Sequence, residues 1–204
     1  MVNINSALPT RQREDMRKPV HVLFKRTKNP YGGVEIDTTS SSGQWRDLSP
    51  FVLGPIDIAG VHSENFENLW QFSKVYPEHL AFDRYEPSPS WFIWRQKGFA
   101  DKRAHRYPLG KGRVPVYSWW SGEHLGYIEA RKTIYAPIYA QFVKGTDSYQ
   151  RLRSLYQSGA TIVLRDYDAY DHIKEGMTLV DVLNNPDRKC GHAFILAMML
   201  QKGM

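Results

Sequence analysis

Cysteine is nearly absent from this sequence, since Cys190 stands alone among 204 residues. A lone cysteine excludes an internal disulfide and a zinc site built from several thiolates, and it favours a reducing compartment, so we expect a cytoplasmic protein. No apolar run approaches about 18 residues, the length that a membrane-spanning helix needs. The polar residues 1–18 lack the apolar segment of a secretory signal, and we expect them to form an arm ahead of the domain.

Motifs of several common catalytic sites are also missing. The seven histidines include no H-x-x-x-H pair, so no metal ion is expected. No G-x-S-x-G nucleophile elbow occurs, which argues against a serine-hydrolase site. The segment LGKGR at 109–113 contains glycines and a lysine but lacks the G-x-x-x-x-G-K-[ST] spacing of a phosphate-binding loop.

The composition that remains is that of a globular protein with an excess of positive charge. Apolar residues make up 42% and charged residues 24% of the chain, which excludes a wholly disordered protein. The length predicts one domain, which we place over residues 19–204. The net charge of +6 suits an anionic partner such as a nucleotide or nucleic acid, but it is equally typical of a small domain kept soluble by its charge.

Strands and helices are mixed without strict βαβ alternation, which predicts a compact domain of the α+β class. Strands are predicted over 20–26, 34–37 and 160–164, with a turn at 28–33 between the first two. A short strand or loop edge is predicted over 48–54 and another short extended piece over 113–120. Residues 85–99, which prolines interrupt, are predicted to form an aromatic loop. Helices are predicted over 64–76, over 122–143 with a division at Pro137, over 147–157 and, centrally packed, over 191–200. Residues 177–183 are ambiguous.

The helix predicted over 64–76 carries a narrow polar row. At about 100° per residue, Gln71 lies about 40° and Lys74 about 20° from Glu67 around the helix axis. The rest of the circumference is apolar, as in a buried helix, and consists of Phe66, Leu69, Trp70, Phe72 and Val75. The polar row therefore either opens into a cavity or faces solvent, where Gln71 would bridge two surface charges.

Burial would give the lysine of this row unusual chemistry. A desolvated ammonium group has a lowered pKa, so a fraction of Lys74 would be the neutral amine near neutral pH. A neutral amine attacks carbonyl-like carbon atoms, and Glu67 could carry protons at the same place. Lys74, Glu67 and Gln71 are thus the candidate catalytic residues.

A second group of polar residues follows the strand predicted over 160–164. The segment DYDAYD at 166–171 contains the three carboxylates of Asp166, Asp168 and Asp171. Such a cluster could bind a metal ion, cap the next segment or lie in solvent. We favour the cap or the solvated position over the metal site.

The polar row resembles a motif of the NADAR family, which includes the YbiA-like proteins. The pattern F-E-x-x-x-Q-x-x-K, from Phe66 to Lys74, is similar to the signature helix of that family. Weaker similarities follow in the family's order, at LSPF 48–51, ARKTIYAPIYAQF 130–142, SGATIVLRD 158–166 and NNPDRKCGHAFILAMML 184–200. The resemblance covers about residues 45–200. It departs from the family at Arg165, near the position of a strand glutamate, and lacks the W-G pair that follows that strand.

The resemblance implies an α+β fold and an N-glycosidase that acts on a ribose without a metal or other cofactor. Substrates of the family are ADP-ribosylated guanine in nucleic acid and an early riboflavin-pathway intermediate. The implied substrate is therefore a ribosylated nucleotide or an ADP-ribosylated nucleic acid. Lys74 would attack the ribose C1 as a Schiff-base nucleophile, Glu67 would shuttle protons and Gln71 would orient hydroxyl groups.

Further residues are expected to contact this substrate. Asp166 or Asp168 would replace the family's strand glutamate, and both are candidate substrate-binding residues. Aromatic side chains stack on nucleobases, at about 1–3 kcal/mol per contact. The aromatic candidates for the binding site are Phe51, Trp70, Trp119 and Trp120, with Trp91 and Trp94 as further loop tryptophans. Taken singly, each tryptophan is more typical of a core or wall position than of a platform for a base.

A different class of function stays open on the sequence alone. Arg165 in place of an acid favours a catalytically inactive, basic accessory protein that binds nucleic acid or protein on the same fold. The enzyme requires Lys74 and Glu67 in an open pocket. A convex position of both residues, or a buried ion pair of Lys74 without a cavity, would favour the binding protein.

Overall fold

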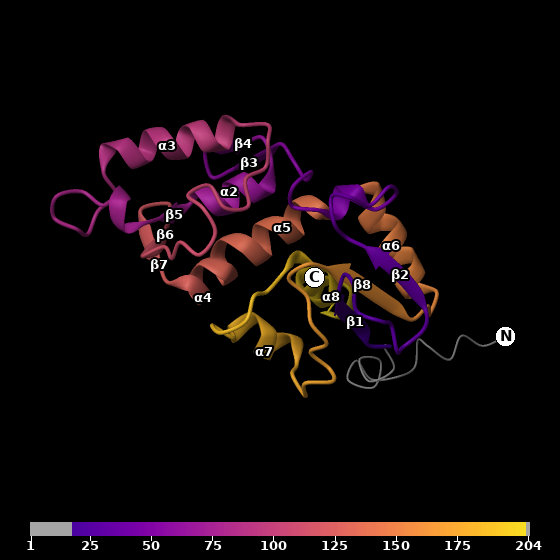
Figure 1. Ribbon diagram of the computed structural model, residues 1–204. Helices are drawn as coiled ribbons and strands as arrows, with labels where there is room; N and C mark the ends of the chain where they lie inside the picture. The colour runs from indigo at the N-terminus through magenta and orange to yellow at the C-terminus, as the bar shows by residue number, and fades with distance from the viewer. Residues whose placement is uncertain (1–17, 203–204) are drawn as a thin grey trace, which may run out of the picture.

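The computed structural model describes residues 18–202. A three-stranded parallel sheet lies in one half of the molecule (Figure 1). Strand β8 (Ile162–Asp166) is in the middle and pairs in parallel with β1 (Val20–Phe24) and β2 (Val34–Asp37). All five residues of β8 are buried. Because the three strands are parallel, the residues that follow them gather at one edge of the sheet.

The apolar helix α8 (His192–Lys202) packs centrally in this half. Its residues from His192 to Leu200 are all buried, and it contacts β1, β8 and α5. The central helix predicted over 191–200 is thus confirmed. Helix α6 (Asp147–Gln157), at the predicted bounds, and the short α7 (Leu179–Asn184) lie at the periphery of the same half (Figure 1).

The other half is built around α2 (Phe66–Phe72) and α3 (Pro89–Ala100), which pack against each other. Gly98 permits this contact, because a Cβ at that position would lie 2.0 Å from the ring of Phe72. Two small antiparallel sheets complete this half: β3 (Ile56–Ile58) with β4 (Val61–Ser63), and β5 (Lys74–Val75) with β6 (Tyr117–Trp120) and β7 (Glu123–Leu125).

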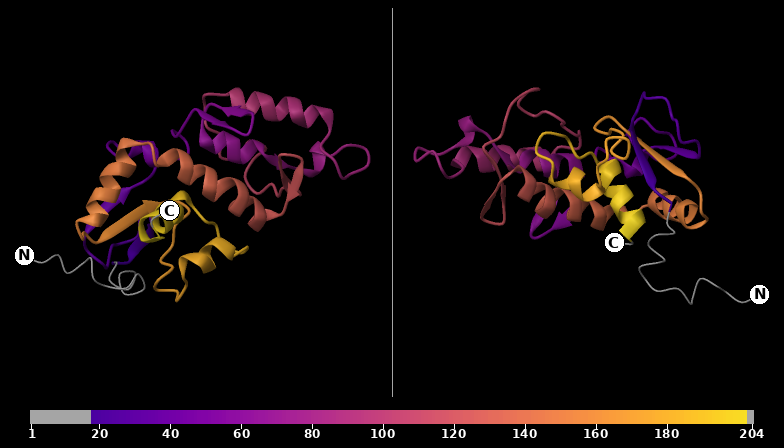
Figure 2. Two further views of the ribbon diagram at one scale, coloured as in Figure 1. Left: turned by 180° about the vertical axis from the view of Figure 1, so that it is seen from behind. Right: turned by 90° about the horizontal axis from the view of Figure 1, so that it is seen from below.

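A divided helix runs between the two halves, as the view from behind also shows (Figure 2). Its segment α4 (Tyr127–Ala130) continues through the π-helical turn η4 (Arg131–Tyr135) into α5 (Ala136–Val143). The division lies just before Pro137, which has no backbone donor for the preceding turn. The predicted division at this proline is therefore confirmed, although the helix begins at residue 127 and not at 122 because residues 123–125 form β7.

The first two strands do not form the hairpin that the turn at 28–33 suggests. Strand β8 inserts between them and pairs with both. Gly33 has a positive φ of 81° and passes so close to Thr161 that a Cβ would lie 2.3 Å from the carbonyl oxygen of Thr161. Gly33 thus permits a close crossing of two segments of the chain.

One further prediction is corrected by a helix cap, and for another the structure decides between two alternatives. The segment 85–99 is no aromatic loop, because α3 begins at Pro89, where the Oγ of Ser88 accepts from the backbone N–H of Trp91 at 3.4 Å. Of the two alternatives predicted for 48–54, the structure has the loop: residues 49–54 form no strand and follow a short 3-10 helix, η2 (Arg46–Leu48). A second such helix is η3 (Pro77–His79).

The mixed helices and small sheets place the fold in the α+β class, as predicted. Of the polar arm predicted over 1–18, residues 1–17 lie outside the described residues. Among the helices that the structure describes, none has the length and apolarity to cross a membrane.

Candidate active site

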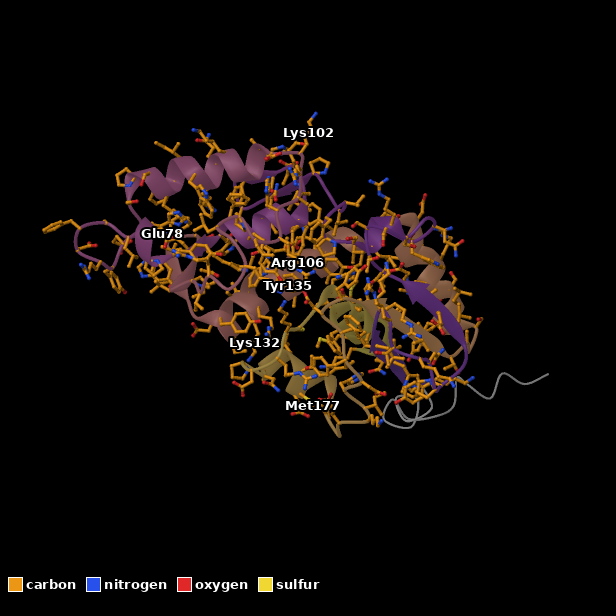
Figure 3. The ribbon with its side chains drawn as sticks, in the orientation of Figure 1. Glu78, Lys102, Arg106, Lys132, Tyr135 and Met177 are labelled. Atoms are coloured by element: carbon orange, nitrogen blue, oxygen red, sulfur yellow. The ribbon has the colours of Figure 1, made fainter. Side chains whose placement is uncertain are left out.

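A cavity of about 380 Å³ lies at the carboxyl ends of the parallel strands. In sheets with parallel strands, ligands bind outside these ends, so the position itself indicates a binding site. Figure 3 shows Arg106 and Tyr135, both lining residues, near the centre of the molecule. One wall consists of residues at the ends of β2 and β8, namely Thr39, Ser40, Asp166, Tyr167 and Asp168. The opposite wall contains Glu67, Trp70, Gln71 and Lys74.

Lys74, Gln71 and Glu67 form a chain of hydrogen bonds on that opposite wall. The Nζ of Lys74 donates to Oε1 of Gln71 at 2.7 Å, and Nε2 of Gln71 donates to Oε1 of Glu67 at 2.8 Å. The same Nζ lies 4.7 Å from the centre of the Trp70 ring. The contacts of the lysine are therefore a neutral amide and an aromatic ring, and Glu67 is reached only through the amide.

Burial changes the acid–base behaviour of both ends of this chain. It lowers the pKa of Lys74 to about 8, an effect that the charge of Lys189 reinforces and the charges of Glu67 and Asp168 oppose. Burial also raises the pKa of Glu67, against the hydrogen bond from Gln71 and the charge of Lys74. A lysine that loses its proton near pH 8 suits a nucleophile, and a carboxyl that retains its proton suits a proton carrier.

The helix that holds Glu67 and Gln71 ends earlier than the predicted range of 64–76. It closes at Phe72, where the Oγ of Ser73 donates to the carbonyl oxygen of Leu69 at 2.6 Å. Lys74 is the first residue of β5 and pairs with Ser118 of β6, so sheet pairing replaces the last helical turn. The three polar side chains of the row still lie together, because the long side chain of Lys74 reaches Gln71.

Asp166 and His192 form a buried pair on the sheet side of the cavity. The Oδ2 of Asp166 lies 3.2 Å from Nδ1 of His192, and Nε2 of His192 contacts the carbonyl oxygen of Thr38 at 2.8 Å. A carbonyl oxygen only accepts a hydrogen bond, so Nε2 is a protonated nitrogen of the ring. A hydrogen bond between Nδ1 and Oδ2 requires a second proton, carried by one of these two atoms. Gly191 leaves room for this carboxylate, because a Cβ there would lie 2.1 Å from Oδ2.

The carboxylates of 166–171 have separate partners. Asp168 accepts from Nη2 of Arg106 at 2.6 Å and lies 3.1 Å from Nζ of Lys189. Asp171 accepts from the hydroxyl of Tyr31 at 2.6 Å and does not line the cavity. Within residues 18–202 no group of three histidine, cysteine or acidic side chains is arranged to hold a metal ion. The segment therefore supplies two carboxylates to the cavity and one to a neighbouring loop.

The aromatic candidates divide into two groups. Phe51 and Trp70 line the cavity. Trp119 and Trp120 do not line it, and as neighbours on β6 they point to opposite faces of the sheet. The ring of Trp119 lies 5.8 Å from that of Trp91, while Trp120 is buried in the core. Trp94, likewise outside the cavity lining, packs 4.5 Å from the ring of Phe72.

Arg165 is buried and faces away from the cavity. Its Nε and Nη2 lie 2.9 and 2.8 Å from Oε2 of Glu35, and its Nη1 donates to the carbonyl oxygen of Thr27 at 2.6 Å. Side chains alternate along a strand, so Arg165 and Asp166 point to opposite faces. Arg165 thus ties β8 to β2 and to the chain after β1, and the next residue supplies the acid of the cavity.

Other lining residues were not found from the sequence. Arg131 is almost wholly buried, and its Nη1 donates to the carbonyl oxygens of Val182 and Asn185 at 3.1 and 2.9 Å. An arginine within a largely apolar helical segment is the one signal that the sequence offered for it. The further residues that sequence reasoning missed are Tyr76, Arg106, Tyr107, Arg113, Tyr127, Tyr135, Lys189, Cys190 and His192.

Comparison with known proteins assigns the chain to a family. A family model described as a family of unknown function (DUF6939) matches residues 22–180. The match spans more than half of the chain, so the chain belongs to this family. No curated protein and no solved structure gives a match. The matched region includes Glu67, Lys74 and Asp166 and ends before the last lining residues of the cavity, which are at 189–192.

Proposed function

We propose that this protein is an N-glycosidase of the NADAR type, in which Lys74 attacks the C1 atom of a ribose. The observation that carries the proposal is the environment of Lys74. Its amine faces a cavity at the carboxyl ends of the parallel strands, contacts only a neutral amide and an aromatic ring, and has a pKa lowered to about 8 by burial. These are the conditions under which a lysine becomes a nucleophile.

The proposed reaction breaks the bond between C1 and the base nitrogen. The electron pair of this bond goes to the base, which takes a proton from the carboxyl of Glu67. The neutral Nζ of Lys74 bonds to C1, and one of its protons passes to the ring oxygen as the C1–O bond of the sugar ring breaks, which gives a protonated imine. Water then adds to C1 and gives one proton to Glu67, which replaces the proton that went to the base. The C1–Nζ bond breaks, and the free sugar and the lysine are restored without any oxidation or reduction.

The other wall of the cavity fits the sugar side of such a substrate. Asp166 and Asp168 present acceptor oxygens for ribose hydroxyl groups. Phe51 and Trp70 offer aromatic surface for a base. The proposed substrate class is a ribosylated nucleotide or an ADP-ribosylated nucleic acid. No metal enters the proposed reaction.

The binding-protein alternative rests on Arg165, and its placement weakens that argument. Arg165 is bound to Glu35 on the side of β8 that faces away from the cavity, so it does not replace an acid there. Lys74 and Glu67 both line the cavity, as an enzyme requires. The accessory protein remains the second candidate, and it predicts ligand binding without turnover.

Borohydride trapping tests the proposal directly. The protein is incubated with ADP-ribosylated DNA or with ribosylated metabolites, and mass spectrometry follows the released base and any reduced protein adduct. We expect an adduct on Lys74 and turnover in the wild type, and neither in Lys74→Arg, because a guanidinium stays protonated. Lys132→Arg is the matched control, since Lys132 is exposed and lies outside the cavity lining (Figure 3). Unchanged turnover in Lys74→Arg would refute the lysine mechanism.

A further inference from the structure

The loop over residues 107–115 lies at the cavity and combines two glycines with two cations. Gly110, Gly112 and Arg113 line the cavity, and Lys111 lies between the glycines. This is the LGKGR segment, whose spacing differs from that of the common phosphate-binding loop. Because the segment lines the cavity, its own backbone geometry decides what it can bind there.

The backbone of the loop has the form of an anion-binding nest. The φ angle is positive at Gly110 (97°) and Gly112 (88°) but not at Lys111. Alternating φ signs turn successive backbone N–H groups toward one side, and such concave arrangements bind anions. Gly110 donates to the carbonyl oxygen of Tyr107 at 3.0 Å, whereas the N–H groups of Lys111, Gly112 and Arg113 have no acceptor in the described part of the chain.

The space in front of the nest is open and its side chains are available. A Cβ at Gly110 or Gly112 would meet no atom within 4 Å. Lys111 is exposed and has no ion-pair partner among residues 18–202. Arg113 pairs with Glu78, but both side chains are close to half exposed, at 49% and 41%, so this pair is weak and exchangeable.

The neighbouring cavity wall also has more cations than carboxylates. Arg106 and Lys189 share the single carboxylate of Asp168, which leaves one positive charge in excess. A second anion at this place would be stabilised by the excess charge and by the free N–H groups of the loop.

We propose that the loop over 107–115 binds a phosphate group of the ligand at the mouth of the cavity. The backbone N–H groups of residues 111–113 and the side chains of Lys111 and Arg113 hold the phosphate, while Arg106 and Lys189 add positive charge from the neighbouring wall. The ligand is therefore a phosphate ester whose sugar extends toward Lys74. The identity of the sugar rests on the proposed function, but the phosphate site requires no catalysis.

Calorimetric titration with ribose 5-phosphate, pyrophosphate and unphosphorylated ribose tests the site at about 50 mM salt, where charge screening is modest. We expect ribose 5-phosphate to bind at least about tenfold more tightly than ribose, as one or two charged hydrogen bonds predict. The double variant Lys111→Ala/Arg113→Ala should lose about tenfold in affinity for both phosphate probes.

A matched double variant controls for net charge. Lys97→Ala/Lys102→Ala also removes two positive charges, but both lysines are exposed and outside the cavity lining, and Figure 3 shows Lys102 pointing away from the molecule. We expect this control to bind like the wild type. The proposal is overturned if both double variants weaken binding equally, if the loop variant binds normally, or if the wild type does not prefer the phosphorylated sugar.

The outcomes also separate the phosphate site from the proposed function. Phosphate binding that depends on the loop, with no borohydride adduct for any riboside, would support the site and refute the glycosidase. If the loop variant forms the adduct on Lys74 at the rate of the wild type and binds the substrate with the same affinity, the result would support the glycosidase and refute the phosphate site.

Discussion

Lys74 is joined to Glu67 through the side-chain amide of Gln71 and not by an ion pair. The amide accepts from the lysine and donates to the carboxylate, so it connects the two groups without neutralising either charge. A direct carboxylate partner would hold Lys74 in its protonated form. Gln71 thus keeps the proton carrier close while leaving the amine able to lose its proton.

The first prediction concerns the pH dependence of adduct formation. Because only the neutral amine attacks, the single-turnover rate should rise with pH as Lys74 loses its proton around its lowered pKa of about 8, and it should fall again once Glu67 has lost the proton that it gives to the base. Gln71→Glu places a negative charge beside Nζ, which raises the pKa of Lys74. The rising limb should then move to higher pH by about one unit or more. A limb that stays in place in this variant would exclude Lys74 as its source.

The second prediction concerns stability. Burial lowers the pKa of folded Lys74 from 10.5 to about 8, so the unfolded chain binds more protons between these values. The free energy of unfolding of the wild type therefore rises with pH across this window, and below it the full cost of burying the ammonium is present. Lys74→Met removes this cost, so it should stabilise the protein at pH 7 by about 1–3 kcal/mol.

Urea unfolding of the wild type and Lys74→Met at pH 7 and pH 10 measures this effect. The gain from the substitution should shrink toward pH 10, where folded Lys74 is the neutral amine and the cost of burying its ammonium form is largely gone. Lys132→Met serves as control, because Lys132 is exposed and should show no such dependence on pH. If Lys74→Met gained less stability over the wild type at pH 7 than at pH 10, the result would contradict a buried ammonium group at Lys74.

The third prediction concerns the small space beside Asp166. Gly191→Ala places a Cβ 2.1 Å from Oδ2, so the carboxylate must move. We expect a loss of turnover of tenfold or more and a destabilisation of about 1–3 kcal/mol. Gly43→Ala is the control, because a Cβ at Gly43 meets no atom within 4 Å. Normal turnover in Gly191→Ala would show that the position of Asp166 is unimportant for the reaction.

Local sequence patterns predicted the elements that depend on local interactions. The helix α6 (Asp147–Gln157) and the central helix α8 follow from periodicity and caps, and β8 follows from its apolar run. The start of α3 was missed although Ser88 and Pro89 form an ordinary helix start, because the aromatic residues around them suggested a loop.

Other features depend on contacts between distant segments and have no local signal. The end of α2 at Phe72 is set by the pairing of β5 with β6, more than forty residues further along the chain. The cavity likewise joins Arg106 to Asp168, which are 62 positions apart. The row of Glu67, Gln71 and Lys74 could be found because its spacing is short, whereas Arg106, Lys189 and His192 could be placed at the cavity only by the fold.

The last prediction separates the enzyme from the inactive accessory protein at Arg165. The structure assigns this residue to the contact between β8, Glu35 and the carbonyl oxygen of Thr27, outside the cavity. Arg165→Met should therefore destabilise the protein by about 2–4 kcal/mol, because it leaves a carbonyl oxygen without its donor and Glu35 without its ion-pair partner. The value of kcat, measured well below the melting temperature, should stay within about twofold of the wild type, since no cavity residue loses a contact.

Asp166→Asn provides the opposite pattern at the neighbouring position. The amide is nearly equal in size but removes the charge that faces Nδ1 of His192, so unfolding in urea should shift less than in Arg165→Met, whereas the cavity loses a carboxylate and turnover should fall by tenfold or more. Together the two variants assign the two faces of β8 separately, one to stability and one to the reaction. If Arg165→Met abolished turnover without loss of stability, Arg165 would belong to the functional site, and the reading of this chain as a binding protein with an altered site would gain the stronger support.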